Sequence, residues 1–334
     1  MSYHHLIRAA CAAAALTVPA AAMAQDWPAR ELNGIIQWGA GGATDTVSRA
    51  LQHSAEQELG RRIVMTNRSG GSGAIAMRYV QSQRPDGYTL LFGAENPQLY
   101  KVLGLADADY GDFFPINIPA RGVVVITVPA DSPYQTLQDL LDAAQTNPNG
   151  LRMGTMGPGS LSQVVETMIQ SATDFQVTAV PFDGEGPGLT AMMGGALDVI
   201  PASLSAANPM IEAGRIRALA VVNGSAIEQL PGVPPITDTL PDLDRFLPWG
   251  PFYGVFVAKD APAEAQDKLV AAFHTAAQNE DFIAMMQGRG NIMMNISGDE
   301  AQAFLTQWQS VTSWLLQDAG VAKASPEDFG IARP

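Results

Sequence analysis

A short apolar run, a glycine-rich loop and a helix-like segment follow one another repeatedly along this chain of 334 residues. In the first instance, the run Leu32–Trp38 leads into the loop QWGAGGATD over residues 37–45, and the helical pattern after it ends at Gly60. Thr44 or Asp45 is placed to cap this helix. Because strands that alternate with helices pack as parallel α/β layers, the repetition predicts an α/β fold.

Further strands and helices are expected in the same order, and the length of the chain favours about two domains. The expected strands cover residues 62–66, 88–92, 123–128, 151–154, 177–181, 197–201, 217–222 and 252–258. The expected helices cover residues 74–83, 136–147, 161–171, 188–195, 207–214, 262–287 and 297–316. Ser297 and Glu300 match a capping box at the start of the last helix.

The first 24 residues have the pattern of a secretory signal. Residues 9–22 are almost all apolar, and Ala22-Met23-Ala24 has the small-x-small form that signal peptidase cleaves. We expect cleavage after Ala24, so that the mature chain begins at Gln25. The single cysteine of the sequence lies inside this segment, which leaves no disulfide framework and no thiolate chemistry in the mature chain.

The charge balance is strongly acidic. The whole chain has 19 Lys and Arg against 33 Asp and Glu; Arg8 is the one charged residue of segment 1–24, so the remainder carries a formal charge of −15. Binding to nucleic acid requires a basic face, so we expect no nucleic-acid partner. Net charge says little about a small ligand in a cleft, where local dipoles dominate, and it fits an exported protein that avoids non-specific binding.

The glycine-rich loops suggest where an anion would bind. The first N–H groups of a helix lack partners within the helix, and the helix dipole adds roughly half a positive charge at that end. Glycine lets a ligand approach this backbone closely. A strand–loop–helix junction of this kind therefore binds an anion without Lys or Arg, and in open α/β sheets such junctions gather at the carboxyl ends of the strands.

Other readings of the same loops are less well supported. Residues 39–44 are not a dinucleotide fingerprint, because Thr44 stands where the third glycine belongs, and residues 71–76 lack the acidic residue that should follow them. The mature chain has two histidines, His53 and His274, both on polar helical segments, so a Ser–His catalytic pair is unsupported. Asp183 and Glu185 would suit general acid–base catalysis, but two acids in a turn are more often solvated. We expect no enzyme, no cofactor and no metal.

An ordered series of motifs resembles one family over essentially the whole mature chain. The chain resembles the periplasmic solute-binding proteins of tripartite tricarboxylate transporters, also called Bug receptors. The motifs that carry the resemblance are WGAGGATD (38–45), Leu59-Gly60, NRSGGSG (67–73), PDGYTL (85–90), SPYQTLQDL (132–140), GTMGPGS (154–160), VPFDG (180–184), GGALD (194–198) and LPGVPPITD (230–238).

The resemblance implies a type II periplasmic binding protein fold, with two α/β lobes around a ligand cleft and a hinge of crossing strands near 123–128 and 252–257. Lobe 1 would comprise residues 25–123 and 253–334, and lobe 2 residues 124–252. The implied function is capture of a small organic acid in the periplasm and its delivery to a membrane permease, by a monomer. A ligand-sensing receptor for a two-component system remains an alternative, and a secreted enzyme using the same cleft is a further one.

The resemblance also implies a ligand site, in which loop N–H groups hold a carboxylate of the ligand. Its expected residues are Trp38, Gly39, Ala40, Gly41, Gly42, Ala43, Thr44 and Asp45 in the first loop, Ala94, Glu95 and Asn96 after the third strand, and Thr155, Met156, Gly157, Gly159, Ser160, Phe182, Asp183, Gly184 and Ser203 in the second lobe.

This sequence departs from the family pattern at two places. The two prolines expected before Gly41 are Gly39 and Ala40, and the Tyr-Lys expected after Val-Pro is Phe182-Asp183. An acid thus replaces a lysine that would face a distal carboxylate, and Glu185 and Glu95 add further acids near the cleft. Because acids beside an anionic ligand cost affinity, the cleft is expected to suit a ligand with one carboxylate and a hydroxyl- or ammonium-bearing far end.

Overall fold

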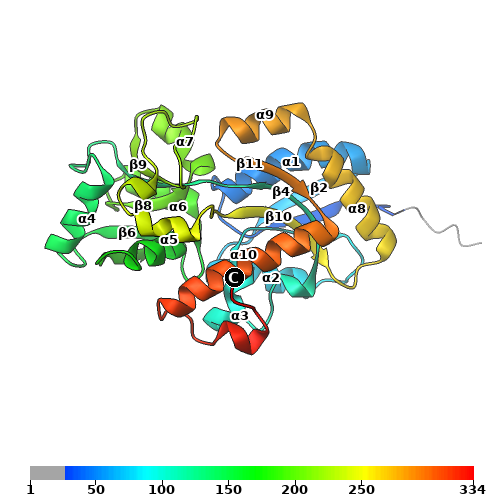
Figure 1. Ribbon diagram of the computed structural model, residues 1–334. Helices are drawn as coiled ribbons and strands as arrows, with labels where there is room; N and C mark the ends of the chain where they lie inside the picture. Colours follow the sequence, from blue (N-terminus) through cyan, green and yellow to red (C-terminus); the bar gives the residue numbers. More distant parts are fainter. Residues whose placement is uncertain (1–26) are drawn as a thin grey trace, which may run out of the picture.

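The computed structural model describes residues 27–334. The expected signal segment, its cleavage point after Ala24 and the mature start at Gln25 lie outside the described residues. The described chain forms two α/β lobes side by side, one built mainly on a six-stranded sheet and the other on two smaller sheets (Figure 1). The α/β expectation is therefore confirmed.

The first lobe is built on a mixed sheet with the strand order β11-β4-β10-β3-β1-β2. Its strands are β1 (Leu32–Ile36), β2 (Ile63–Asn67), β3 (Thr89–Gly93), β4 (Phe113–Arg121), β10 (Phe252–Ala258) and β11 (Ile292–Ile296). β1 pairs in parallel with β2 and β3, as expected, whereas β10 runs antiparallel to both β3 and β4. β1 and β3 are almost wholly buried, as expected of central strands covered on both faces.

Helices cover both faces of this sheet. They are α1 (Ala43–Leu59), α2 (Ala74–Gln81), α3 (Tyr100–Leu103), α8 (Ala263–Ala276), α9 (Glu280–Gly288) and α10 (Gly298–Asp318). α1 ends at Gly60, whose φ of 62° is the left-handed conformation that terminates helices, as expected. Trp308 of α10 packs against Trp249 and Phe252, so the aromatic stripe of the last helix serves the core.

The second lobe has a three-stranded sheet of order β8-β5-β9 and a parallel pair, β6 and β7. Its strands are β5 (Val124–Pro129), β6 (Arg152–Thr155), β7 (Thr178–Pro181), β8 (Ile200–Ser203) and β9 (Ile216–Val222). Its helices are α4 (Leu137–Thr146), α5 (Leu161–Gln170), α6 (Glu185–Met193) and α7 (Leu204–Glu212). Thr136 caps α4 through a capping box with Asp139. Along the chain, α5, α6 and α7 each begin directly after a strand or after the loop that follows a strand.

The chain passes between the lobes twice, at neighbouring places. β4 of the large sheet ends at Arg121 and β5 of the small sheet begins at Val124. The return ends at Pro251, whose carbonyl accepts a hydrogen bond from Gly122 N–H over 2.8 Å. The crossings therefore precede β5 and β10 and lie beside each other. We propose the lobe boundaries stated above, with residues 124–252 as the second lobe, because the small sheets contain only strands from that range. The last residue of this range, Phe252, is also the first residue of β10 in the large sheet.

Four local expectations are wrong. The single helix expected over residues 262–287 is divided into α8 and α9, because Asn279 caps a new helix start through its side chain. β4 and β11 were not expected as strands; β4 contains Pro115 and Pro119, which usually argue against a strand inside a sheet. The residue that caps α1 is Gly42, and Thr44 and Asp45 lie within the first turn. Ser297 precedes α10 but makes no side-chain capping bond; its hydroxyl instead accepts from the Asn117 amide at 3.2 Å.

Within residues 27–334, no helix combines the length and the apolarity needed to cross a membrane.

Candidate functional site

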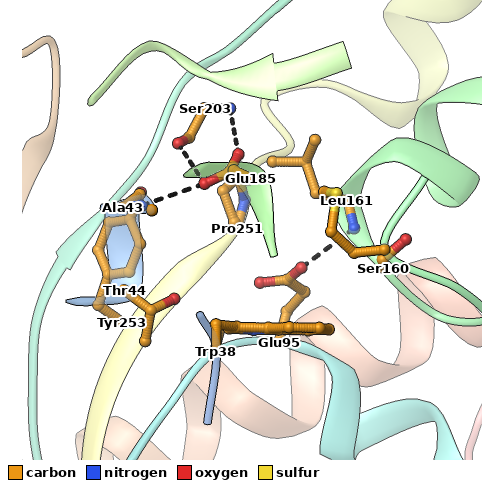
Figure 2. A pocket seen from close by; sticks show the side chains of 13 residues that line it. Trp38, Ala43, Thr44, Glu95, Ser160, Leu161, Glu185, Ser203, Pro251 and Tyr253 are labelled. Atoms are coloured by element: carbon orange, nitrogen blue, oxygen red, sulfur yellow. Dashed lines mark hydrogen bonds between the residues drawn. The ribbon is translucent and has the colours of Figure 1, made fainter. Parts of the chain in front are cut away.

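A cavity lies between the two lobes beside their crossing point. It is lined by Trp38, Gly42, Ala43, Thr44, Ala94, Glu95, Met156, Ser160, Leu161, Glu185, Ser203, Pro251 and Tyr253. Its volume of about 20 Å³ has room for roughly one water molecule. Figure 2 shows the carboxyl groups of Glu95 and Glu185 approaching this space from opposite sides. The lobes are therefore closed on each other, and a ligand of several heavy atoms enters only when they separate.

Helix N-termini from both lobes surround the cavity. α1 of the first lobe begins at Ala43, and α5, α6 and α7 of the second lobe begin at Leu161, Glu185 and Leu204. Each of these ends carries N–H groups that lack partners within the helix, together with the positive end of a helix dipole. The geometry therefore concentrates anion-binding donors at one place without a lysine or arginine among the lining residues.

The carboxylate of Glu185 occupies part of this donor set. It accepts from Ala43 N–H at 3.2 Å, from Ser203 N–H at 2.6 Å and from the Ser203 hydroxyl at 2.8 Å. Ala43 belongs to the first lobe, whereas Glu185 and Ser203 belong to the second. The side chain thus both fills an anion site and joins the lobes (Figure 2).

Glu95 makes the reciprocal contact from the first lobe. It follows β3, is 3% exposed, and its Oε1 accepts from Leu161 N–H, the first residue of α5, over 3.2 Å. The second carboxyl oxygen points toward the middle of the cavity in Figure 2. Each lobe therefore places a glutamate at the start of a helix in the other lobe.

The two acids differ from glutamates in water. Burial raises the pKa of Glu95 from 4.5 to about 8; the hydrogen bonds from its own N–H and from Leu161 oppose the shift, and nearby Glu185 adds to it. Burial also raises the pKa of Glu185, against the bonds from Ser203 and Ala43. Glu95 is therefore mostly protonated at neutral pH and has a proton to donate toward a ligand.

The crossing segments supply the remaining wall. Pro251 and Tyr253 line the cavity, and Tyr253 is 3% exposed. The Tyr253 hydroxyl makes no hydrogen bond of good geometry among the described residues, although the Ser203 hydroxyl lies close enough to oppose the rise of its pKa. Burial raises the pKa of this hydroxyl well above its ordinary value, so it stays protonated. A buried donor without a partner costs free energy, and a ligand atom that accepts from it would remove that cost.

The structure brings part of the first loop to the cavity and uses the rest to hold the loop in shape. Asp45 turns away from the cavity: it accepts from Gly41 N–H at 3.0 Å and from the Asn67 amide at 2.9 Å, and it pairs with Arg49. Gly39 N–H donates to the carbonyl of Asp183 in the second lobe at 2.9 Å. Gly39 and Asp45 thus make contacts within the protein in this closed arrangement, and their ligand roles stay predictions.

In the second-lobe loops, too, only some of the residues line the cavity. The Thr155 hydroxyl accepts from Gly157 N–H and from Ser162, which orders the loop before α5. Met156, Gly157, Phe182 and Asp183 line a separate hollow, together with Gly71, Ser72, Pro181 and Pro187. Ser72 donates to the carbonyl of Met156 across the lobes at 3.5 Å. These residues form the outer contact between the lobes.

Of the expected site residues, the cavity is lined by Trp38, Gly42, Ala43, Thr44, Ala94, Glu95, Met156, Ser160 and Ser203. Outside its lining are Gly39, Ala40, Gly41, Asp45, Asn96, Thr155, Gly157, Gly159, Phe182, Asp183 and Gly184. Asn96 is fully buried, with an amide group that lacks partners among the described residues. Leu161, Glu185, Pro251 and Tyr253 were not among the expected residues. The acidic turn around Glu185 was the one sequence signal available for them.

Comparison with known proteins assigns the family. The family model described as the tripartite tricarboxylate transporter family receptor matches residues 47–320. The chain belongs to this receptor family. A UPF0065 protein of Bordetella bronchiseptica is 31% identical to this receptor over 232 residues, which cover 69% of this chain and 68% of that protein.

Solved structures agree with the receptor's fold. The periplasmic binding protein BugD matches with a TM-score of 0.84 at 24% identity, over 89% of this chain and all of that one. A protein of R. palustris solved with adipate matches with a TM-score of 0.80 at 26% identity, over 89% of this chain and 99% of that chain. The two-lobe periplasmic binding protein fold expected from the sequence is confirmed.

Proposed function

We propose that this receptor captures a small organic acid between its lobes in the periplasm and delivers it to a tripartite tricarboxylate-type membrane permease. The observation that carries the proposal is the convergence of helix N-termini from both lobes on one cavity, where Ala43 and Leu161 N–H groups already bind carboxyl oxygens. The adipate complex of the R. palustris relative supports the ligand class. The first 24 residues would direct export and be removed after Ala24.

Capture would proceed by closure of the lobes around the ligand. Donors for the ligand lie on both lobes, so the closed form binds it better than the open form, and binding shifts the equilibrium toward closure. The closed form would then dock on the permease. No residue of the cavity is assigned a catalytic role.

Thermal unfolding of residues 25–334 tests the ligand class, with a panel of mono-, di- and tricarboxylates, hydroxy acids, aromatic acids and amino acids. A ligand at about 100 times its Kd adds roughly 2.7 kcal/mol to the free energy of unfolding. Gly42→Leu should remove the ligand-induced gain in thermal stability, because the leucine side chain meets Glu185 and Gly186 where the two lobes contact each other. Gly288→Leu, at an open surface, is the matched control.

The outcomes separate the proposal from its rivals. A shift from an acid, lost in Gly42→Leu and kept in Gly288→Leu, supports acid capture at this cavity. A shift from sugars or amines alone contradicts it. Small-angle scattering adds a second readout, since a bound acid should reduce the radius of gyration. N-terminal mass analysis of the exported protein checks the mature start at Gln25.

A further inference from the structure

We propose that Glu185 is a built-in occupant of the anion site formed by the Ala43 N–H, the Ser203 N–H and the Ser203 hydroxyl, and that it excludes a second ligand carboxylate from this end of the cavity. The proposal rests on the proposed function and narrows its ligand class. The ligand that fits is an acid with one carboxylate and a far end that donates hydrogen bonds, such as an ammonium, hydroxyl or amide group.

The geometry shows a carboxylate in a fitted site. Three donors converge on one carboxyl group at 2.6–3.2 Å, two of them backbone N–H groups whose direction is fixed by the starts of α1 and α7. Glu185 is itself the first residue of α6, so its backbone is held by that helix. A ligand carboxylate that used these donors would have to displace a side chain that is tethered there and returns whenever the lobes close.

Charge adds to this steric exclusion. The residues that line the cavity include Glu95 and Glu185 and no lysine, arginine or histidine. Asp183, the third acid of this region, is exposed, and its backbone carbonyl accepts the hydrogen bond from Gly39 N–H between the lobes. A second ligand carboxylate would face Glu185 with no compensating cation, whereas a donor group of the ligand would pair with the edge of the Glu185 carboxylate.

The first test uses chemical rescue. Glu185→Gly removes a group with the shape of propionate and leaves its three donors in place. We expect the variant to lose thermal stability and to regain at least about half of the loss in sodium propionate, since propionate binds only the folded form. Sodium chloride at the same ionic strength and neutral propionamide should give no comparable recovery.

A matched control is available at another helix start. Glu280 is the first residue of α9 and is exposed. Glu280→Gly therefore makes the same change of residue at the same helix position, away from the cavity. It and the wild type should respond to propionate no more than to chloride. Equal recovery of Glu185→Gly in chloride or propionamide would overturn the anion site.

The second test compares matched ligands by calorimetry. The pairs are succinate with 4-aminobutyrate and adipate with 6-aminohexanoate, in which an ammonium group replaces one carboxylate. The wild type should favour the amino acid of a pair by at least about tenfold, the scale expected for a charge facing a like charge at short range. Glu185→Gly should shift the ratio toward the diacid by a similar factor. Glu185→Gln, which keeps an oxygen acceptor without the charge, should shift it in the same direction by less.

Each result decides the matter. An unchanged ratio in Glu185→Gly, or a wild type that favours the diacids, overturns the exclusion. If the wild type binds none of these probes, the propionate experiment alone decides whether Glu185 fills an anion site. Rescue by propionate together with a wild type that binds no acid from the wider panel would contradict the proposed function and leave this inference standing.

Discussion

The carboxylate of Glu185 lies 3.2 Å from the backbone nitrogen of Ala43, although the two residues belong to different lobes and are separated by 142 positions in the sequence. Glu95 makes the mirror contact with Leu161. Two acids, each at the start of a helix in the opposite lobe, therefore contribute to the closed state of this receptor. Conditions that change their ionisation should change the balance between open and closed forms.

The first prediction concerns the pH dependence of Glu95. Its pKa is raised from 4.5 to about 8 in the closed cleft, so its stabilising contribution is fully present below pH 4.5 and is lost as pH rises through 8. On this basis the wild type should lose on the order of 4 kcal/mol of stability between pH 5 and pH 9 relative to Glu95→Gln. Parallel thermal unfolding of both proteins measures the difference.

Neighbouring groups define the control for that measurement. Glu185 faces Glu95 across the cavity and also titrates, whereas the hydroxyls of Tyr100 and Tyr253 have pKa values raised by burial and stay protonated. Glu185→Gln should therefore retain most of the pH dependence. If Glu95→Gln shows the same pH profile as the wild type, Glu95 does not carry the buried proton.

The second prediction concerns Gly186. A Cβ atom at this position would lie 2.5 Å from the Ala40 carbonyl oxygen in the other lobe. Gly186→Ala should therefore hold the lobes apart, giving a larger radius of gyration and at least about tenfold weaker ligand binding, because the closed form is depleted. Gly288→Ala, which meets no atom within 4 Å, should behave as the wild type. A radius of gyration in Gly186→Ala equal to that of the wild type would show that the contact between the lobes accommodates the added methyl group.

The third prediction concerns the Tyr253 hydroxyl. Because it makes no hydrogen bond of good geometry among the described residues, Tyr253→Phe should leave the stability of the ligand-free protein unchanged or raise it slightly. If the ligand accepts from this hydroxyl, the same change should weaken binding by about fivefold to tenfold, the usual value of one hydrogen bond. Calorimetry with the best acid of the panel checks it; equal affinities would place the ligand elsewhere in the cavity.

The fourth prediction concerns Asp198, whose carboxylate accepts from Arg152 N–H at 2.8 Å and from the guanidinium at 2.8 and 3.0 Å. The Arg152 side chain holds the pKa of Asp198 below its usual value of 3.8, so the stabilisation is present above that pH and is lost as pH falls through the lowered pKa. Asp198→Asn should cost about 1 kcal/mol, an estimate reduced for partial exposure.

A second aspartate–arginine pair gives the comparison for Asp198. Asp318 pairs with Arg333 at 2.9 Å, but both side chains are more than half exposed. Asp318→Asn should therefore change the free energy of unfolding by less than about 0.5 kcal/mol. Equal losses in the two variants would mean that the backbone bond of Asp198 contributes nothing. Denaturant titration at neutral pH resolves the two cases.

The sequence predicted the alternating strands and helices well, because β1, β3 and α1 carry their periodicity and punctuation locally. The strand directions were harder to predict. β10 returns to the large sheet after the whole second lobe, so its antiparallel pairing with β3 depends on the path of the chain rather than on its own residues. β4 was missed for a different reason. It contains Pro115 and Pro119, and prolines usually argue against a strand inside a sheet.

The candidate site was likewise predictable from the sequence only in part. Thr44 and Ser160 follow from rules about strand–helix junctions, and the cavity is indeed lined by both residues. The role of Asp45 does not follow, because its partners Gly41 and Asn67 are fixed by the packing of the loop. Glu185 reaches Ala43 only when the lobes meet, and a contact made by closure leaves no periodic signal in either segment.

The hydrogen bond between Gly122 and Pro251 has a consequence for how solvent reaches the cavity. Because both chain crossings lie together there, the proposed opening would be a rotation about a short axis, in which the displacement of any contact grows with its distance from that axis. Pro251 and Tyr253 put the inner wall of the cavity next to the axis. A small rotation therefore parts the outer rim, at Ser72 and Met156, while the inner wall moves little. Water and solute would exchange through the rim, and the inner wall would keep its shape from one capture to the next.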